Sequence, residues 1–410
     1  MSQQHQTGKH KGAIGKNPGA HTWRPATQAV RGGTNRSGFG ETSEALFLTA
    51  GYVYDSAEEA EARFAGEREG FVYSRFANPT VAMFEERMAL LEGAEAAKAT
   101  ATGMAAVTGA LLCQLSAGDH IVASRAMFGS CRYIVDTLLP RFGVEFTYVD
   151  GSDTAQWQAA LRSTTKVLFL ETPSNPTLEI VDLKAVADIA HQAGARLVVD
   201  NVFASPVLQK PMTFGADVVV YSATKHIDGQ GRCMGGAIVS DAAFIEDHAS
   251  NFLRQTGPAL SPFNAWVLLK GLETMDLRVR QMSRNATEIA AFLADHPKVS
   301  RTFYPGHKDH AQHQLAEAQM EMGGTMVTMD IKGGKDSAFR LMNALSIIDI
   351  SNNLGDSKSL ITHPTTTTHK RLSDEEREEL GVTPGLLRLS VGLEDVRDLR
   401  EDLARALDAA

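Results

Sequence analysis

The stretch from about residue 98 to residue 240 alternates short apolar runs with helical segments, and few folds are compatible with that alternation. The apolar runs are rich in Val, Ile and Leu, as strands buried on both faces are. Strands and helices that repeat in this way predict an α/β fold with a mostly parallel sheet flanked by helices. The expected strands cover residues 120–123, 144–149, 167–170, 196–200, 217–221 and 236–239, and the expected helices follow Gly103 and span 129–139, 155–161 and 182–193.

Three units are expected along the 410 residues. Residues 1–72 form an N-terminal arm, because the chain up to about residue 40 is rich in Gly, Lys, Thr and Asn and has little to bury. Residues 73–273 form a large domain around the sheet, and residues 274–410 form a smaller C-terminal α/β domain. The other expected elements are helices beginning at Ser56 and at Asn78-Pro79, a long helix from Ser261-Pro262 toward His296, strands at 324–330 and 386–390, and a terminal helix striped by Val396, Leu399, Leu403 and Leu407.

Two of the expected strands end in residues of particular chemistry. Asp200 closes the run Arg196-Leu-Val-Val-Asp, and Lys225 follows the run that starts at Val218. Ligands bind outside the carboxyl ends of parallel strands, so both side chains are expected in one site. A lysine that can form a Schiff base and a carboxylate that can pair with a ring nitrogen are what pyridoxal phosphate requires. Either residue alone would mean little.

Short donors for a phosphate lie nearby in the sequence. Ser222 and Thr224 immediately precede the lysine, and Gly103-Met104 begins a predicted helix after Thr102. Free backbone N–H groups and the helix dipole at such a start favour a phosphate. A tight turn that needs glycine is the alternative reading of Gly103.

Four further residues complete the predicted site. Asn175, in Glu171-Thr-Pro-Ser-Asn-Pro176, follows a buried strand and is placed to donate to the phenolic oxygen of the cofactor, with a plain turn as the alternative. Tyr73 and Arg75 stand just ahead of a helix and suit a phosphate. Arg388 lies within a predicted strand, where an unpaired charge would be costly, so it is expected to meet a substrate carboxylate; a structural ion pair is the alternative.

Composition excludes several other classes of function. A net charge of -9 without a long basic run argues against nucleic acid and anionic membranes as partners. Three cysteines without a CxxC pair predict neither disulfides nor a zinc site, and the spacing of His307, His310 and His313 does not suit a metal. We therefore expect no metal. Neither a membrane span nor a signal peptide is recognisable, so we expect a cytoplasmic protein.

Over residues 40–410 the chain resembles the cystathionine γ-synthase family, the fold-type I pyridoxal phosphate enzymes of cysteine and methionine metabolism. The segments that carry the resemblance are Tyr73-Ser-Arg-Phe-Ala-Asn-Pro-Thr80, Glu171-Thr-Pro-Ser-Asn-Pro176, Ser222-Ala-Thr-Lys225, Asn353-Leu-Gly-Asp356 through His363-Pro364, and Arg388-Leu-Ser-Val-Gly-Leu-Glu394.

The resemblance implies a role for each of these residues. Lys225 carries the cofactor and Asp200 pairs with its ring nitrogen, while Gly103, Met104, Ser222 and Thr224 hold the phosphate. Tyr73 and Arg75 come from a neighbouring subunit, which makes residues 1–72 an inter-subunit segment as well. Family members are usually tetramers, so we expect a homotetramer with active sites shared between subunits.

The sequence departs from the family at two places. Phe128 stands where most relatives have a tyrosine over the cofactor ring, so the stacking ring is kept and the hydroxyl is lost. A site without that acid should suit a substrate whose γ-substituent departs easily, such as an acyl ester. Asn353 replaces a serine and is expected to contact the substrate.

Two other segments, His226-Ile-Asp-Gly-Gln-Gly-Arg232 and Ile350-Ser-Asn-Asn-Leu-Gly-Asp356, are similar to one branch of the family. The function implied is replacement of the succinyl group of O-succinyl-L-homoserine by sulfide, giving L-homocysteine and succinate in methionine biosynthesis. Arg125, Arg132 and Arg232 are candidates for binding the distal succinyl carboxylate. A cystathionine γ-synthase that uses cysteine, a C–S lyase that adds no nucleophile, and a non-catalytic protein on the same fold remain alternatives.

Overall fold

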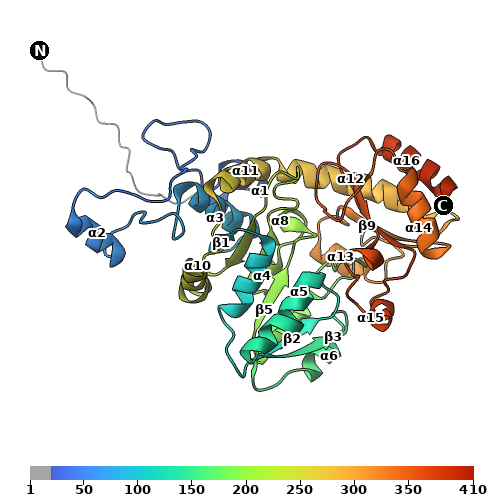
Figure 1. The fold of residues 1–410 in the computed structure, drawn as a ribbon, viewed down its shortest axis with the longest axis horizontal. Coiled ribbons are helices and arrows are strands. Elements are labelled where there is room, and N and C mark those ends of the chain that lie inside the picture. The colour runs from blue at the N-terminus through green and yellow to red at the C-terminus, as the bar shows by residue number, and fades with distance from the viewer. Residues whose placement is uncertain (1–19) are drawn as a thin grey trace, which may run out of the picture.

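The computed structural model describes residues 20–410, which form two sheets built from separate parts of the chain (Figure 1). The first part of the predicted N-terminal arm, residues 1–19, lies outside the described residues. The large sheet comprises β1 (Ala96–Thr100), β2 (His120–Ser124), β3 (Glu145–Val149), β4 (Thr165–Glu171), β5 (Arg196–Asp200), β6 (Val218–Ser222) and β7 (Gly236–Ser240). The small sheet comprises β8 (Val299–Phe303), β9 (Met326–Ile331), β10 (Asp349–Ile350), β11 (Leu360–Thr362) and β12 (Leu386–Ser390).

The large sheet has the strand order β1-β7-β6-β5-β4-β2-β3. Strands β2 to β6 run parallel to their neighbours, which confirms the mostly parallel sheet. The exceptions lie at one edge, where β7 pairs antiparallel with both β6 and β1. Strand β1 was not predicted, because its sequence Ala-Ala-Lys-Ala-Thr lacks the branched residues that mark a strand.

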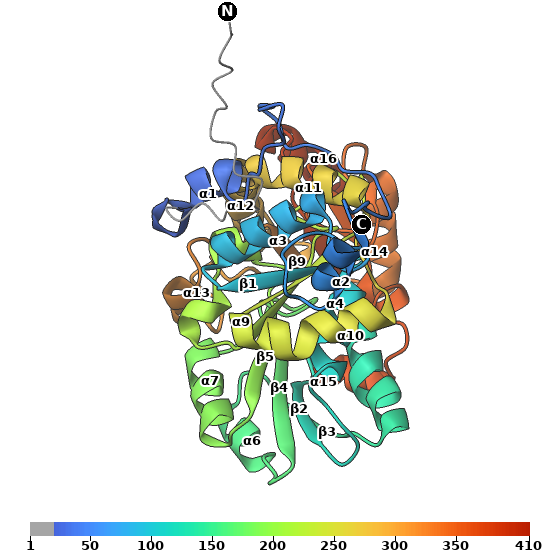
Figure 2. The ribbon, with the colours of Figure 1, turned by 90° about the vertical axis from the view of Figure 1, so that its left-hand side faces the viewer.

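Helices cover both faces of this sheet (Figure 2). One face packs against α3 (Pro79–Glu92), α7 (Leu183–Gln192) and α11 (Pro262–Glu273). The other packs against α4 (Gly103–Leu112), α5 (Gly129–Tyr133) and α10 (Asn251–Thr256). Shorter elements fill the connections: the π-helical turn Ile134–Leu138, the 3-10 turns Leu139–Phe142 and Pro211–Phe214, α6 (Thr154–Ala159), α8 (Ser205–Leu208), α9 (Ala242–Phe244) and the π-helical turn Ile245–Ser250.

A long helix pair leads from the large sheet to the small one. The long helix predicted from Ser261-Pro262 toward His296 is present as two helices, because α11 ends at Glu273 and α12 (Met275–Ala294) begins after Thr274. The two sheets therefore fall on either side of residue 274. We propose 73–273 and 274–410 as the limits of the large and small domains. The small domain also contains α13 (His313–Gln319), α14 (Gly334–Ala344), the 3-10 turn Pro364–Thr366, α15 (Asp374–Glu379) and α16 (Val396–Ala409).

The small sheet uses its two faces differently because side chains alternate along a strand. Leu387 and Leu389 of β12 belong to a core with α12, α14 and α16. Arg388 lies between them in the sequence, and its guanidinium reaches Asn175 of the large domain. The face of the small sheet that carries Arg388 is thus turned toward the large domain.

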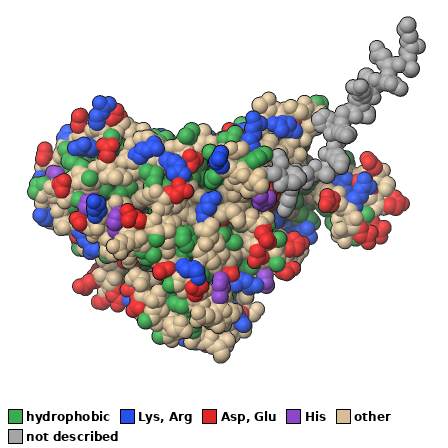
Figure 3. Space-filling view, turned by 180° about the vertical axis from the view of Figure 1, so that it is seen from behind, with side chains coloured by type: hydrophobic (Ala, Val, Ile, Leu, Met, Phe, Trp, Pro, Cys, Tyr) green, Lys and Arg blue, Asp and Glu red, His purple; other side chains and the backbone are tan. Residues whose placement is uncertain are grey.

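The N-terminal region divides into an anchored part and a projecting part. Helix α1 (Pro25–Arg31) contacts α3 and α11, and its Ala29 is buried, so the prediction of an arm with little to bury was wrong for this segment. Helix α2 (Ala57–Phe64) stands away from the body (Figures 1 and 3). Val53 and Phe64, beside and within it, are 93% and 68% exposed. Such exposed apolar groups are typical of a segment that contacts another molecule.

Candidate active site

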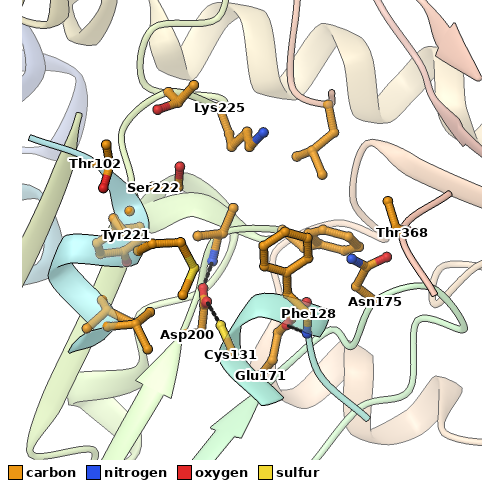
Figure 4. Close-up of a pocket in the computed structure, with 18 of the residues that line it drawn as sticks. Thr102, Phe128, Cys131, Glu171, Asn175, Asp200, Tyr221, Ser222, Lys225 and Thr368 are labelled. Carbon is orange, nitrogen blue, oxygen red and sulfur yellow. Dashed lines mark hydrogen bonds between the residues drawn. The ribbon is translucent and has the colours of Figure 1, made fainter. Parts of the chain in front are cut away.

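A pocket of about 260 Å³ opens at the carboxyl ends of β4, β5 and β6, between the large sheet and the small domain (Figure 4). This is the edge at which ligands bind in open α/β sheets. Most of the residues predicted for the site line it together: Gly103, Met104, Phe128, Asn175, Asp200, Ser222, Thr224, Lys225 and Arg388.

One end of the pocket gathers small hydrogen-bond donors. The start of α4 lies so close to the end of β6 that a Cβ on Gly103 would be 2.5 Å from the Cβ of Ser222. Thr102 caps the helix by accepting a hydrogen bond from the N–H of Ala105 at 3.0 Å. The N–H groups of Gly103 and Met104 have no acceptor within the helix, because the first turn of a helix supplies none. With the hydroxyls of Ser222 and Thr224 beside them, they suit a phosphate.

The opposite end is acidic. Asp200 and Glu171 are neighbours in the register of β5 and β4, and both are buried. Asp200 accepts a hydrogen bond from the N–H of Val202 at 3.1 Å, and the thiol of Cys131 lies 3.9 Å from its other oxygen. Burial raises the pKa of Asp200 to about 7. Burial, and then the negative charge of Asp200, raise the pKa of Glu171 well above its usual range. The pair therefore favours a cation next to it.

An aromatic ring is fixed beside this acidic pair. The N–H of Phe128 donates to Glu171 at 2.7 Å, just where α5 begins. Figure 4 shows the ring of Phe128 extending into the pocket above Glu171 and Cys131. A planar ligand can stack on this ring.

Lys225 projects into the middle of the pocket (Figure 4). Burial, together with the positive charge of Arg388, lowers its pKa to about 8. Its Nζ donates to Asn353 at 2.5 Å. Asn353 itself does not line the pocket, and its side chain contacts the lysine. Its contact with the substrate stays a prediction.

Arg388 is 2% exposed and has no carboxylate partner among residues 20–410 within ion-pair distance. Its guanidinium donates to the side-chain oxygen of Asn175 at 2.9 Å and to the carbonyl of Asn352 at 3.0 Å, while Nε is buried without an acceptor. Burial lowers its pKa to about 10. The alternative of a structural ion pair thus finds no partner, and a guanidinium with a spare donor suits a carboxylate ligand.

Two predicted residues, Tyr73 and Arg75, lie away from this pocket. Tyr73 is 42% exposed, and its backbone forms an isolated bridge with Gly51. Arg75 packs over the ring of Phe76 and donates to the carbonyl of Arg254. Within one chain these two side chains do not contribute to the site.

The three arginines considered for a distal carboxylate are also outside the pocket. Each is engaged by an acidic side chain of the chain itself, as the ion pairs Arg125–Glu379, Arg132–Glu376 and Arg232–Asp228 show. The structure therefore gives no support to any of them as a ligand for the substrate.

The two segments that mark the branch pack against each other next to Lys225. A Cβ on Gly355 would lie 2.7 Å from the backbone nitrogen of His226, and one on Gly231 would lie 2.6 Å from the carboxylate of Asp356. Both glycines have a positive φ, which favours glycine, and at Gly355 the backbone of His226 also leaves no room for a side chain. This contact positions Asn353 opposite the lysine.

The sequence analysis assigned no role in the site to Glu171, Cys131, Asn352 or Thr368, which also line the pocket. Glu171 could have been found, because it ends a buried strand as Asp200 does. The other three become neighbours only through tertiary contacts that leave no local pattern in the sequence.

The side chains that are present fit pyridoxal phosphate. The glycine-lined cradle suits its phosphate, the buried carboxylate suits a protonated ring nitrogen, and Phe128 and Lys225 suit its ring and its aldehyde. Among residues 20–410, no three His, Cys, Asp or Glu side chains gather into a site for a metal ion. No helix in that range is both long and apolar enough to cross a membrane.

Comparisons with known proteins agree with this fit. The family model for the Cys/Met metabolism PLP-dependent enzymes matches residues 26–408. An O-succinylhomoserine sulfhydrylase from Mycobacterium tuberculosis is 54% identical, over 93% of this chain and 95% of its own length. One from Pseudomonas aeruginosa is 49% identical with the same coverage, and an L-methionine gamma-lyase from Porphyromonas gingivalis is 39% identical over 94% of this chain and 97% of its own.

Solved structures are similar as well. A candidate O-acetylhomoserine (thiol)-lyase from Campylobacter jejuni has a TM-score of 0.91 and 31% identity, over 94% of this chain and 100% of its own, and it carries N'-pyridoxyl-lysine-5'-monophosphate. A cystathionine gamma-lyase from Lactobacillus plantarum has a TM-score of 0.89 and 32% identity, over 94% of this chain and 99% of its own.

Proposed function

We propose that this chain, which belongs to the Cys/Met metabolism family of PLP-dependent enzymes, replaces the succinyl group of O-succinyl-L-homoserine with sulfide and so forms L-homocysteine and succinate. The observation that carries the proposal is the convergence of Lys225, Asp200 and Arg388 on one pocket, in a chain 54% identical to a sulfhydrylase of that specificity. The predicted function, the cofactor and the class of enzyme agree with the relatives.

The residues divide the binding tasks between the two ends of the pocket. The cradle of Gly103, Met104, Ser222 and Thr224 holds the phosphate, and Asp200 holds the charge of the ring nitrogen. Arg388 binds the α-carboxylate of the amino acid through its spare donor. Asn175 uses its amide oxygen to orient Arg388, which leaves its NH₂ free to donate toward the phenolic oxygen.

Proton transfer falls to Lys225. Pyridoxal phosphate, when bound, supplies an electron sink that stabilises negative charge at the substrate Cα. Because the pKa of Lys225 is lowered to about 8, a substantial fraction of the amine is neutral near that pH and accepts a proton from Cα. Asn353 holds the amine at 2.5 Å and orients it for this transfer and for returning the protons later.

The pocket favours a leaving group that needs no acid. Phe128 presents a ring without a hydroxyl, and the hydroxyl of Tyr221 donates to Glu92 on the far side of the sheet rather than into the pocket. A carboxylate such as succinate departs from Cγ without being protonated, whereas a thiolate benefits from a general acid. This supports an acylated homoserine over a thioether substrate.

We propose that Tyr73 and Arg75 complete the site of a second copy of the chain, within a homotetramer. They are exposed or half-exposed, lie outside their own pocket, and follow the projecting segment around α2. The hydroxyl and guanidinium would bind the phosphate of the neighbouring site. We place the enzyme in the cytoplasm, because Cys113, Cys131 and Cys233 are all free.

Sharing of sites can be tested by complementation. Lys225→Ala and Arg75→Ala are each expected to be nearly inactive. Co-expression of the two variants should restore about a quarter of wild-type activity, because half of the dimers are mixed and each mixed dimer has one intact site. No recovery in verified mixed oligomers would place Arg75 in its own subunit's site or outside the site.

The reaction itself is tested with one substrate and three conditions. The purified holoenzyme receives O-succinyl-L-homoserine with sulfide, with cysteine, or alone, and products are identified by mass spectrometry. We expect homocysteine as the main product and none from Lys225→Ala, while Lys184→Ala, at an exposed surface ion pair, serves as the control. Cystathionine as the main product would select a cystathionine γ-synthase, and 2-oxobutyrate in all three conditions would select a lyase.

A further inference from the structure

Cys131 occupies a place in the pocket that the proposed reaction does not yet use. It is 1% exposed, lines the pocket, and lies in α5 three residues after Phe128. Residues three apart share one face of a helix. Figure 4 shows that this face meets the two buried carboxylates, with Phe128 over Glu171 and Cys131 against Asp200.

Asp200 has few donors for a buried carboxylate. Its Oδ1 accepts from the N–H of Val202 at 3.1 Å, and Val202 has no side-chain donor. Among residues 20–410, the one donor within hydrogen-bond distance of its Oδ2 is the Cys131 thiol at 3.9 Å. Burial raises the pKa of the thiol well above its usual range, and the negative charges of Asp200 and Glu171 raise it further, so the sulfur keeps its proton and acts as a donor.

We propose that Cys131 is a positioning residue for Asp200, holding its carboxylate ionised and oriented toward the ring nitrogen of the cofactor. A donor on Oδ2 stabilises the charged form of the carboxylate against the cost of burial. A thiol is a weaker hydrogen-bond donor than a hydroxyl. The Cys131 thiol therefore stabilises the negative charge of Asp200 but leaves the carboxylate able to accept a hydrogen bond from the ring nitrogen. Its helix also carries the stacking ring, so α5 positions both the carboxylate and the ring.

Four other ionisable groups share the pocket with Asp200, each from a different segment of the chain. They are Glu171 from β4, Tyr221 at the end of β6, Lys225 in the turn that follows, and Arg388 from β12. None of them is altered by a substitution at residue 131. A shift in pH dependence that differs between variants of Cys131 therefore reports on the thiol and its contact with Asp200.

The inference is tested by the pH at which the holoenzyme loses its cofactor. Wild type, Cys131→Ala and Cys131→Ser are dialysed exhaustively between pH 5 and 9, and the cofactor retained is measured by its visible absorbance. Cys131→Ala removes the donor, so Asp200 should be protonated at higher pH, and the acid-side midpoint should rise by about half a pH unit. Cys131→Ser supplies a stronger donor of similar size, so its midpoint should fall.

Opposite shifts distinguish a donor from a packing residue. A cavity in the alanine variant or a buried hydroxyl in the serine variant would weaken cofactor binding in both, so shifts in one direction, or none, would overturn the inference. Cys113→Ser, a part-buried thiol outside the pocket, is the matched control and should coincide with wild type. Because no substrate is present, the inference rests on the cofactor site alone, and a wrong choice of acyl donor would leave the expected shifts intact.

Discussion

Two of the regions that bury carboxylates stabilise them in opposite ways. Glu44, at the root of the N-terminal segment, accepts from Arg87 of α3 at 2.5 Å and from Lys270 of α11. Burial alone would raise its pKa, but these two cations outweigh burial and lower it to about 2. In the pocket, Asp200 and Glu171 are buried just as deeply, yet no cation in the part of the chain that the structure describes forms an ion pair with them.

This difference in ion pairing separates a structural role for Glu44 from a ligand-binding role for Asp200. Glu44 is complete within the chain and fastens the N-terminal segment to two helices, since Trp266 also donates to its carbonyl at 3.0 Å. Asp200 is incomplete without a cationic partner, because burying an unpaired carboxylate costs free energy. A carboxylate buried without a cation of its own therefore marks a place for a cationic ligand.

The largest expected effect on stability is at Glu44. Glu44→Gln removes the anion but leaves Arg87 buried, which should lower the free energy of unfolding by about 3–5 kcal/mol. Urea denaturation of the holoenzyme measures this loss. Glu145→Gln, in the exposed pair with Arg162, is the control and should change it by less than about 0.5 kcal/mol. Equal losses of unfolding free energy in the two variants would mean that the buried ion pairs of Glu44 do not stabilise the fold more than an exposed pair does.

Asp200→Asn should reduce turnover without reducing the stability of the cofactor-free protein. The amide cannot stabilise a protonated ring nitrogen, so turnover should fall about 100-fold or more. The cofactor-free variant should unfold at the same urea concentration as cofactor-free wild type or at a higher one, because a neutral side chain is easier to bury. A variant that kept its turnover but lost stability as Glu44→Gln does would put Asp200 in a structural role.

The pH dependence of stability should separate the two regions. The pKa of Asp200 is raised from 3.8 to about 7, so the folded protein holds a proton there that the unfolded chain releases above pH 3.8. Cofactor-free wild type should therefore lose stability relative to Asp200→Asn as the pH rises from about 4 to 7, and the difference should be constant above that. Glu44, with its lowered pKa, stabilises the fold above pH 4.5 and loses that contribution as the pH falls toward 2.

Unfolding midpoints of the two cofactor-free proteins, recorded from pH 4 to 8, check this window. We expect a divergence of a few kcal/mol, because one pKa unit corresponds to about 1.4 kcal/mol. Parallel curves would show that Asp200 does not carry the raised pKa.

The sequence predicted the parts of the site that follow a local rule. Asp200 was found because it ends an apolar run that becomes a central strand, and Lys225 because it closely follows another such run. Arg388 was found because a charge inside a strand is unusual. The parallel order of β2 to β6 followed from the alternation of strands and helices. These features depend on residues close together in the chain.

The remainder depends on contacts between distant segments. Two hydrogen bonds in the pocket join residues 43 and 69 positions apart, Phe128 to Glu171 and Cys131 to Asp200. No periodic pattern in the sequence predicts such contacts. Strand β1 is held by β7, which follows it by well over a hundred residues. The predicted roles of Tyr73 and Arg75 depend on contacts with a second chain, and both side chains lie outside the pocket of their own chain.

The smallest expected effect concerns a further buried carboxylate, Glu92, whose surroundings are intermediate between those of Glu44 and those of Asp200. Glu92 is fully buried and forms no ion pair with any residue from 20 to 410. It accepts hydrogen bonds from the hydroxyl of Tyr221 and from the N–H of Met212, the latter at 3.3 Å. Burial raises its pKa to about 7 in spite of these donors. Tyr221→Phe removes one of them and should lower the free energy of unfolding by about 1–2 kcal/mol at pH 8.

The loss should shrink toward pH 6, because a protonated Glu92 needs the hydroxyl less than an ionised one does. Urea unfolding of wild type and Tyr221→Phe at pH 6 and pH 8 gives the two differences. A loss that is the same at both values would mean that Tyr221 only packs there and that Glu92 stays neutral in both. A loss that grows with pH would show that the chain stabilises the ionised form of Glu92, as it does that of Glu44. For Glu92 the partners are neutral hydrogen-bond donors, whereas for Glu44 they are cations.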